Sequence, residues 1–91
     1  MNKQDLIVQV ADATGLGRAE ASRAVESVFD VISGALRRGD EVRLVGFGTF
    51  TVSRRKASEG RNPRTGEPIQ IPETKNPKFR AGKTLKQAVN G

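Results

Sequence analysis

The sequence contains no cysteine, histidine, tryptophan or tyrosine among its 91 residues. Without cysteine there are no disulfides and no thiol redox chemistry, and without histidine the usual Cys/His zinc sites are excluded as well. Histidine is also the commonest general base in enzymes, and no paired carboxylates fall in a predicted cleft. We therefore expect no metal, no cofactor and no small-molecule substrate, and we expect that the protein is not an enzyme.

Long apolar runs are missing too. None approaches the roughly 18 residues that a membrane-spanning helix needs, and Met1 to Asp5 show no signal-peptide pattern. We therefore expect a cytoplasmic protein with no membrane partner. A chain of 91 residues is short for a domain, so we expect one domain over 1–91 with a thin core, for which a partner subunit is the usual remedy.

Positive charge is unevenly distributed. The chain has a net charge of +6 and a pI near 10.5. Residues 1–53 hold six basic and seven acidic side chains and sum to −1, whereas residues 54–91 hold ten and three and sum to +7. This segregation favours a polyanionic partner such as a nucleic acid, although many solvated surfaces are also basic.

The first half predicts a helical hairpin. Asn2 can cap a helix that ends at Thr14-Gly15, with Asp5 supporting the cap. A longer helix is predicted from Arg18 to about Arg38, because apolar residues recur at three- and four-residue spacing from Ala21 to Leu36. Two amphipathic helices by themselves indicate packing and no particular function.

The apolar period then changes to the alternation typical of strands. Strands are predicted at 41–44 and 49–53, and the second is expected to continue through 54–59, which has no apolar face to bury. The return strand Pro68–Pro72 holds two prolines, which cannot donate to a ladder, so it cannot be central in a sheet. We therefore predict a free two-stranded arm over residues 54–75, with a disordered loop as the alternative.

The remaining segment, 76–91, is expected to rejoin the body as a strand and to end in a short helix from Lys83 to Val89, with Leu85 and Val89 facing inward. Between the first two strands, Gly46-Phe47-Gly48 lacks the lysine and the glycine spacing of a phosphate-binding loop, so we interpret it as a tight turn beside a core. The predicted fold class is α+β, with a helical base, a three-stranded antiparallel sheet extended into a β-hairpin arm, and a short C-terminal helix.

Basic side chains gather on the predicted arm and at its root. Turn-forming residues fill 60–67, where Asn62-Pro63 begins the turn. Arginines near an exposed tip can enter the narrow DNA minor groove, and an exposed proline beside them can act as an apolar wedge between base pairs. Turn geometry alone is the other interpretation of Asn62-Pro63. The basic set comprises Arg54, Arg55, Lys56, Arg61, Arg64, Lys75, Arg80, Lys83 and Lys86.

Four motifs extend over essentially the full length of the chain: Asn2-Lys3 with Leu6-Ile7, Val42–Phe50, Gly60–Gly66, and Pro77–Lys83 with Leu85-Lys86. Together they strongly resemble the bacterial histone-like HU family, whose close relative is integration host factor. The arm-tip motif Gly60–Gly66 is the most specific of the four.

This resemblance implies an intertwined dimer, either a homodimer or a heterodimer with a paralogue, whose two arms embrace double-stranded DNA. It implies that the protein bends DNA with little sequence specificity and compacts or stabilises the nucleoid. Pro63 would be the wedge, held by Arg61, Asn62 and Arg64. The resemblance assigns phosphate contacts to Lys3, Arg54, Arg55, Arg80, Lys83 and Lys86. Lys75 completes the predicted DNA-binding set, and the predicted dimer core comprises Leu44, Phe47, Phe50 and Phe79.

Three features depart from the family pattern. Gly17 stands where members often have a serine or threonine cap on the second helix, and it is a slightly weaker cap. Glu67 and Gln70 replace lysines that are common on the return strand, and Glu59 adds another acid; these predict a shallower salt dependence of DNA binding. A scaffold module whose arm grips an acidic protein is the alternative from another functional class.

Overall fold

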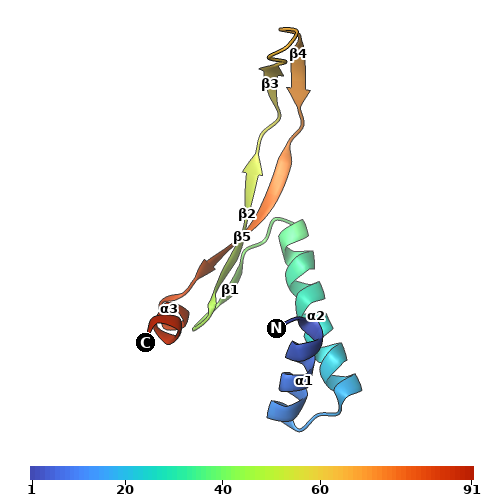
Figure 1. The fold of residues 1–91 in the computed structure, drawn as a ribbon, viewed down its shortest axis with the longest axis vertical. Helices are drawn as coiled ribbons and strands as arrows, with labels where there is room; N and C mark the ends of the chain where they lie inside the picture. The colour runs from blue at the N-terminus through green and yellow to red at the C-terminus, as the bar shows by residue number, and fades with distance from the viewer.

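The computed structural model describes residues 1–91, arranged as a helical hairpin, a small sheet, a long arm and a separate C-terminal helix (Figure 1). The α+β class is confirmed, and each predicted helix and strand is present except that the strand expected to run unbroken through 54–59 is divided in two. In chain order the elements are α1 Lys3–Thr14, α2 Arg18–Arg37, β1 Val42–Leu44, β2 Gly48–Arg55, β3 Ser58–Arg61, β4 Pro68–Ile71, β5 Thr74–Ala81 and α3 Lys83–Asn90. No helix is both long enough and apolar enough to span a membrane.

The helical hairpin has the caps that its sequence predicts. Asn2 Oδ1 accepts a hydrogen bond from the Asp5 N–H at 2.9 Å, and Asp5 Oδ2 accepts one from the Asn2 N–H at 3.1 Å. Helix α1 ends at Gly15, whose φ of 76° suits a residue without Cβ. Helix α2 begins after Gly17 with no side-chain cap, as the departure from the family pattern predicts. The two helices pack through a small core of Ile7, Ala11, Ala21 and Val25.

The strands form two antiparallel sheets: β2 and β3 pair with β5 and β4 in one long hairpin, and β1 pairs with β2. The body sheet has the order β1-β2-β5, and β3 pairs with β4 farther out along the arm. The expectation of one unbroken strand through 54–59 is wrong, because β2 ends at Arg55 and β3 begins at Ser58. Pro72 directly follows β4 and lies opposite Ala57, between the ends of β2 and β3. Because proline has no N–H to donate, the pairing of the two strands is interrupted there. The register is nevertheless the same on both sides, with Arg55 opposite Thr74 and Ser58 opposite Ile71.

One chain buries very little of itself. Only five of 91 residues are buried, and the radius of gyration is 19.2 Å, against about 12 Å for a compact chain of this length. The accessible surface is 7623 Å², which exceeds by about 2,400 Å² the value for a compact monomer of this mass. Val89, expected to face inward, is 77% exposed, because no element of the chain packs extensively on α3; Leu85 is half-buried.

Candidate nucleic-acid interface

The arm tip is a hydrogen-bonded loop centred on Asn62. Its Oδ1 accepts from the Arg64 N–H at 2.9 Å, and its backbone N–H donates to the Glu67 carbonyl at 2.8 Å while its carbonyl accepts from the Gly66 N–H at 2.7 Å. Gly66 closes the loop with a φ of 71°, which glycine adopts without steric cost. The Asn62 side chain therefore shapes the turn, and Pro63 is left exposed between Arg61 and Arg64. The tip is the farthest part of the molecule from the helices (Figure 1).

Neighbouring side chains on a strand point to opposite faces, so the basic residues at the arm root divide into two sets. Arg54 and Arg55 lie on opposite faces of β2, and Lys75 and Arg80 lie on opposite faces of β5. One face of the β2–β5 pair carries Phe50 opposite Phe79, and Arg54 opposite Lys75. The other face bears Thr49, Thr51, Ser53, Arg55, Thr74, Asn76, Lys78 and Arg80.

Lys78 is the basic residue that the sequence reasoning omitted from the candidate site. It is exposed and pairs with Thr51 in the register, two residues from Arg80 on the same strand and therefore on the same face. The signal that could have found it is the alternation of Asn76, Lys78 and Arg80 in the predicted last strand. The face that carries Arg55, Lys78 and Arg80 is polar throughout, and we call it the polar face.

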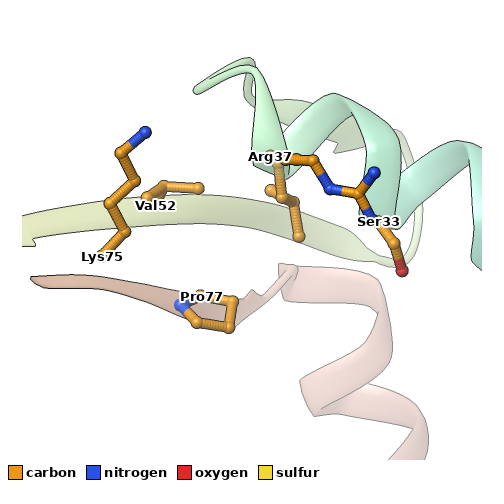
Figure 2. Close-up of a pocket in the computed structure, with 6 residues that line it drawn as sticks. Ser33, Arg37, Val52, Lys75 and Pro77 are labelled. Atoms are coloured by element: carbon orange, nitrogen blue, oxygen red, sulfur yellow. The ribbon is translucent and has the colours of Figure 1, made fainter.

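The opposite face of the sheet is turned toward α2. A groove of about 380 Å³ between them is lined by Ser33, Leu36, Arg37, Val52, Lys75 and Pro77. Figure 2 shows Arg37 on α2, Val52 on β2, and Lys75 and Pro77 on β5. Lys75 is thus on the helix-facing side of the sheet, and the structure does not bring it together with Arg55 and Arg80.

Two of the predicted phosphate contacts already take part in ion pairs. Arg54 Nε lies 3.2 Å from Glu73 Oε1 at the arm root. Lys3 Nζ lies 2.8 Å from Glu26 Oε1 on the helical base, far from the arm tip. The hydrogen bond from Lys3 to Glu26, together with the charge of Glu26, raises the pKa of the Lys3 ammonium, so Lys3 is charged at neutral pH.

Lys83 and Lys86 lie three residues apart on α3, so they share one face of that helix. The helix is connected to the sheet by the Gly82 N–H, which donates to the Phe47 carbonyl at 2.8 Å. Both lysines are exposed, whereas Leu85 between them is half-buried. The structure therefore presents the two lysines together at the lower end of the sheet, apart from the arm (Figure 1).

The phenylalanines predicted to share a core do lie together. The Phe79 ring centroid is 4.8 Å from that of Phe50 and 5.4 Å from that of Phe47. Gly48 makes room for them, because a Cβ there would lie 2.5 Å from the Phe79 ring. Within one chain, however, Leu44, Phe47 and Phe79 are exposed and Phe50 is only partly covered. This cluster is an apolar surface of the single chain, not a closed core.

Comparison with known proteins agrees with this geometry. The family model described as "Bacterial DNA-binding protein" matches residues 1–90. DNA-binding protein HRm of Rhizobium meliloti is 58% identical over 90 residues, which cover 99% of this chain and 100% of the relative. DNA-binding protein HU 1 of Bacillus subtilis is 54% identical over 91 residues, which cover 100% of this chain and 99% of the relative.

Solved structures give the same result. The Anabaena HU–DNA cocrystal structure has a TM-score of 0.81 at 42% identity and covers 98% of this chain and 97% of that one. HU from Thermotoga maritima has a TM-score of 0.69 at 29% identity and covers 98% of both chains. With the helical base, the sheet, the proline-tipped arm and the full-length match in agreement, this chain belongs to the bacterial DNA-binding protein family, the family of the HU proteins.

Proposed function

We propose that this protein is an architectural DNA-binding protein that grips double-stranded DNA with little sequence preference and bends it. The observation that carries the proposal is the arm, which ends in a hydrogen-bonded loop with Pro63 exposed between Arg61 and Arg64. The relatives named above are DNA-binding proteins, and the Anabaena HU was crystallised with DNA. This role needs no catalytic step and no cofactor, and it would associate the protein with the nucleoid.

The tip supplies the bending. Arginine side chains are attracted into the narrow, electronegative minor groove, and a rigid proline inserted between base pairs partly unstacks them and kinks the duplex. Asn62 holds Pro63 in place by accepting the Arg64 N–H. In this proposal Asn62 acts chiefly as a positioning residue for the wedge.

The body supplies the phosphate contacts. Arg55, Lys78 and Arg80 share the polar face of the sheet, and Lys83 and Lys86 lie near its lower end. Phosphate contacts carry no base information, which explains the expected low sequence preference. Lys3, Arg54 and Lys75 stay in the candidate set, but Lys3 and Arg54 must first exchange a carboxylate partner for phosphate.

We further propose that two copies form the binding unit. The exposed surface beyond that of a compact monomer, about 2,400 Å² per chain, lies in the range that obligate dimers bury. An all-apolar groove on the helices, lined by Leu6, Val10, Ala24, Val25, Val28 and Phe29, lacks a partner in one chain. A second copy would cover this groove together with the cluster of Leu44, Phe47, Phe50 and Phe79.

Fluorescence anisotropy with several unrelated duplexes tests the function. We expect dissociation constants that agree within a few-fold across the sequences and rise steeply with salt. A strong preference for one sequence would contradict the proposal and favour a subunit like integration host factor. No binding to any duplex at low salt, with binding to an acidic protein instead, would favour the scaffold alternative. Mass measurement with and without a nicked duplex gives the stoichiometry.

A further inference from the structure

The helix wall of the groove between α2 and the sheet is amphipathic. Ser33, Leu36 and Arg37 line it, and their three- and four-residue spacing places them on one face of α2. Leu36 is half-buried, whereas Arg37 is exposed in the last turn of the helix. This wall therefore presents an aliphatic surface, a hydroxyl and a guanidinium group within about one turn of helix.

The sheet wall has the same combination of apolar and basic groups. Val52 of β2 lies directly opposite Pro77 of β5, and Lys75 is two residues from Pro77 on the same strand. The three side chains therefore share the helix-facing side of the sheet. In Figure 2 the two basic side chains belong to different walls, Arg37 to α2 and Lys75 to β5. The groove thus has an apolar floor with one cation from each wall.

Neither of these cations has a carboxylate partner. None of the four ion pairs of the chain includes Arg37 or Lys75. Glu73, the acid at the arm root, contacts Arg54, which lies opposite Lys75. The groove therefore has two basic groups with no acidic counterpart, which favours an anionic occupant.

We propose that this groove binds a small phosphate monoester with an apolar body. The apolar body lies on Leu36, Val52 and Pro77, and the phosphate accepts hydrogen bonds from Arg37 and Lys75. A phosphate monoester carries about −1.5 to −2 charges at neutral pH, which matches the two cations. The volume of about 380 Å³ falls in the range of small-molecule sites, which are mostly apolar with a few polar groups. The inference goes beyond the proposed function, because the groove is on the side of the sheet opposite the polar face.

A second copy of the chain is the other candidate occupant, and the charges argue against it. The neighbouring hollow has an almost entirely apolar lining that includes Phe29, Ile32 and Phe50, and it continues the surface assigned to the second copy. The groove itself has two charged side chains, and burying them without acidic partners is costly. The second copy is therefore expected to cover the apolar hollow and to leave the end with the two cations open.

The bound phosphate also acts on the arm root. Lys75 lies opposite Arg54, and like charges in directly opposed positions weaken strand pairing. An anion on Lys75 offsets this repulsion, and its contact with Arg37 connects the arm root to the end of α2.

An NMR titration of the ¹⁵N-labelled full chain with phenyl phosphate, at constant ionic strength, tests the site. We expect saturable binding with a dissociation constant below about 1 mM. Amide shifts should concentrate at Ser33, Leu36, Arg37, Val52 and Lys75. Inorganic phosphate supplies the charge without the apolar body, and phenol supplies the ring without the charge, so each should bind at least about tenfold more weakly.

Arg37→Gln and Lys75→Gln identify the two anion contacts. Both residues are exposed, so the fold is expected to stay intact, which circular dichroism checks. Each change should weaken phenyl phosphate binding about tenfold, because a charge-assisted hydrogen bond is lost. Arg38→Gln is the matched control, since Arg38 follows Arg37 in the chain but does not line the groove. It should bind the probe within about twofold of the parent protein.

Equal affinity for phenyl phosphate and inorganic phosphate would overturn the inference, because the apolar floor would then take no part. An equal loss in Arg38→Gln would also overturn it, since net charge alone would account for the binding. Absence of saturable binding would mean that a second copy closes the groove. Displacement of the probe by an equimolar short duplex would contradict a separate site and assign the groove to the DNA interface.

Discussion

At the scale of the residue, the tip loop separates two roles that the sequence motif presents together. The side-chain oxygen of Asn62 accepts a hydrogen bond from the Arg64 N–H. Its backbone carbonyl accepts one from the Gly66 N–H, and its backbone N–H donates one to the Glu67 carbonyl. Pro63 makes none of these bonds through its ring and is exposed. Because the loop is built by its neighbours, Pro63 can be altered without dismantling the turn.

We therefore expect Pro63→Ala to leave the fold and the melting temperature nearly unchanged while reducing DNA bending. Alanine lacks the rigid ring that unstacks a base step, so affinity for nicked duplex should fall about tenfold. Ligase-mediated circularisation of short DNA measures the bending, and circular dichroism checks the fold. Undiminished circularisation by the variant would show that Pro63 is not the wedge.

Gly48 gives a prediction about stability. A Cβ at this position would lie 2.5 Å from the Phe79 ring and 2.6 Å from the Arg80 carbonyl oxygen, so ring and backbone must both shift. We expect Gly48→Ala to lower the free energy of unfolding by about 1–3 kcal/mol, measured by urea denaturation at fixed protein concentration. Gly34→Ala is the matched control, since its added Cβ would meet only the end of the flexible Arg38 side chain, at 3.6 Å; equal losses in both would mean that packing at Gly48 is not the cause.

At the scale of the element, the arm root sets two like charges directly opposite each other. Arg54 faces Lys75 across β2 and β5, an arrangement that weakens strand pairing. Glu73 offsets it through its 3.2 Å contact with Arg54. It is the only acid of residues 54–91 that forms an ion pair. Glu73 therefore competes with phosphate for Arg54.

We expect Glu73→Gln to strengthen DNA binding a few-fold and to steepen its salt dependence, because Arg54 no longer has to leave a carboxylate. The variant should also be slightly less stable, since the Arg54–Lys75 repulsion is no longer offset. Glu59→Gln removes an equal charge that has no ion-pair partner and serves as the control. Identical salt slopes for the two variants would rule out the competition.

Local features of these elements could be predicted from the sequence, and features that depend on cross-strand partners could not. The Asn2–Asp5 cap and the Gly15 stop involve residues a few positions apart, so the motif alone was sufficient. The interruption between β2 and β3 cannot be predicted locally, because it depends on Pro72 lying opposite Ala57 in the folded hairpin. The Lys3–Glu26 pair joins residues 23 positions apart, and only the packing of α1 on α2 brings them together.

The sequence indicates which basic residues belong to the candidate site, but not on which face of the sheet each of them lies. Charge and resemblance point to most of the basic residues of the proposed site, but they do not distinguish Arg54 from Arg55. Strand alternation places them on opposite faces, and the same alternation adds Lys78 to the polar face. The ion pair between Arg54 and Glu73 needs the register of the folded hairpin, which no local pattern supplies.

At the scale of the whole molecule, the single chain is an extended shape of 61 × 32 × 25 Å with almost no interior. Its largest apolar side chains lie on surfaces that a second copy would cover. Folding and association are therefore expected to be one process, and the stability of the protein should depend on its concentration.

Dilution tests this expectation. The melting temperature should fall by roughly 2–5 °C for each tenfold dilution, because unfolding releases two chains. Differential scanning fluorimetry over a hundredfold range of concentration provides the measurement, with sedimentation to confirm the mass. A melting temperature that is independent of concentration would contradict an obligate dimer.

The β2–β5 and β3–β4 pairs keep the same register across the interruption at 56–57, and this register limits how the arm can vary in length. Inserting or deleting one residue in a single strand at 56–57 would shift the outer strand by one position and exchange its two faces. After a deletion the isoleucines of β4 would be opposed by Glu59 and Arg61, and after an insertion by Ala57 and Glu59, instead of Ser58 and Gly60. An arm of different length can therefore keep the same side chains on each face in two ways: by equal insertions or deletions in both strands, or by inserting or deleting two residues in one strand.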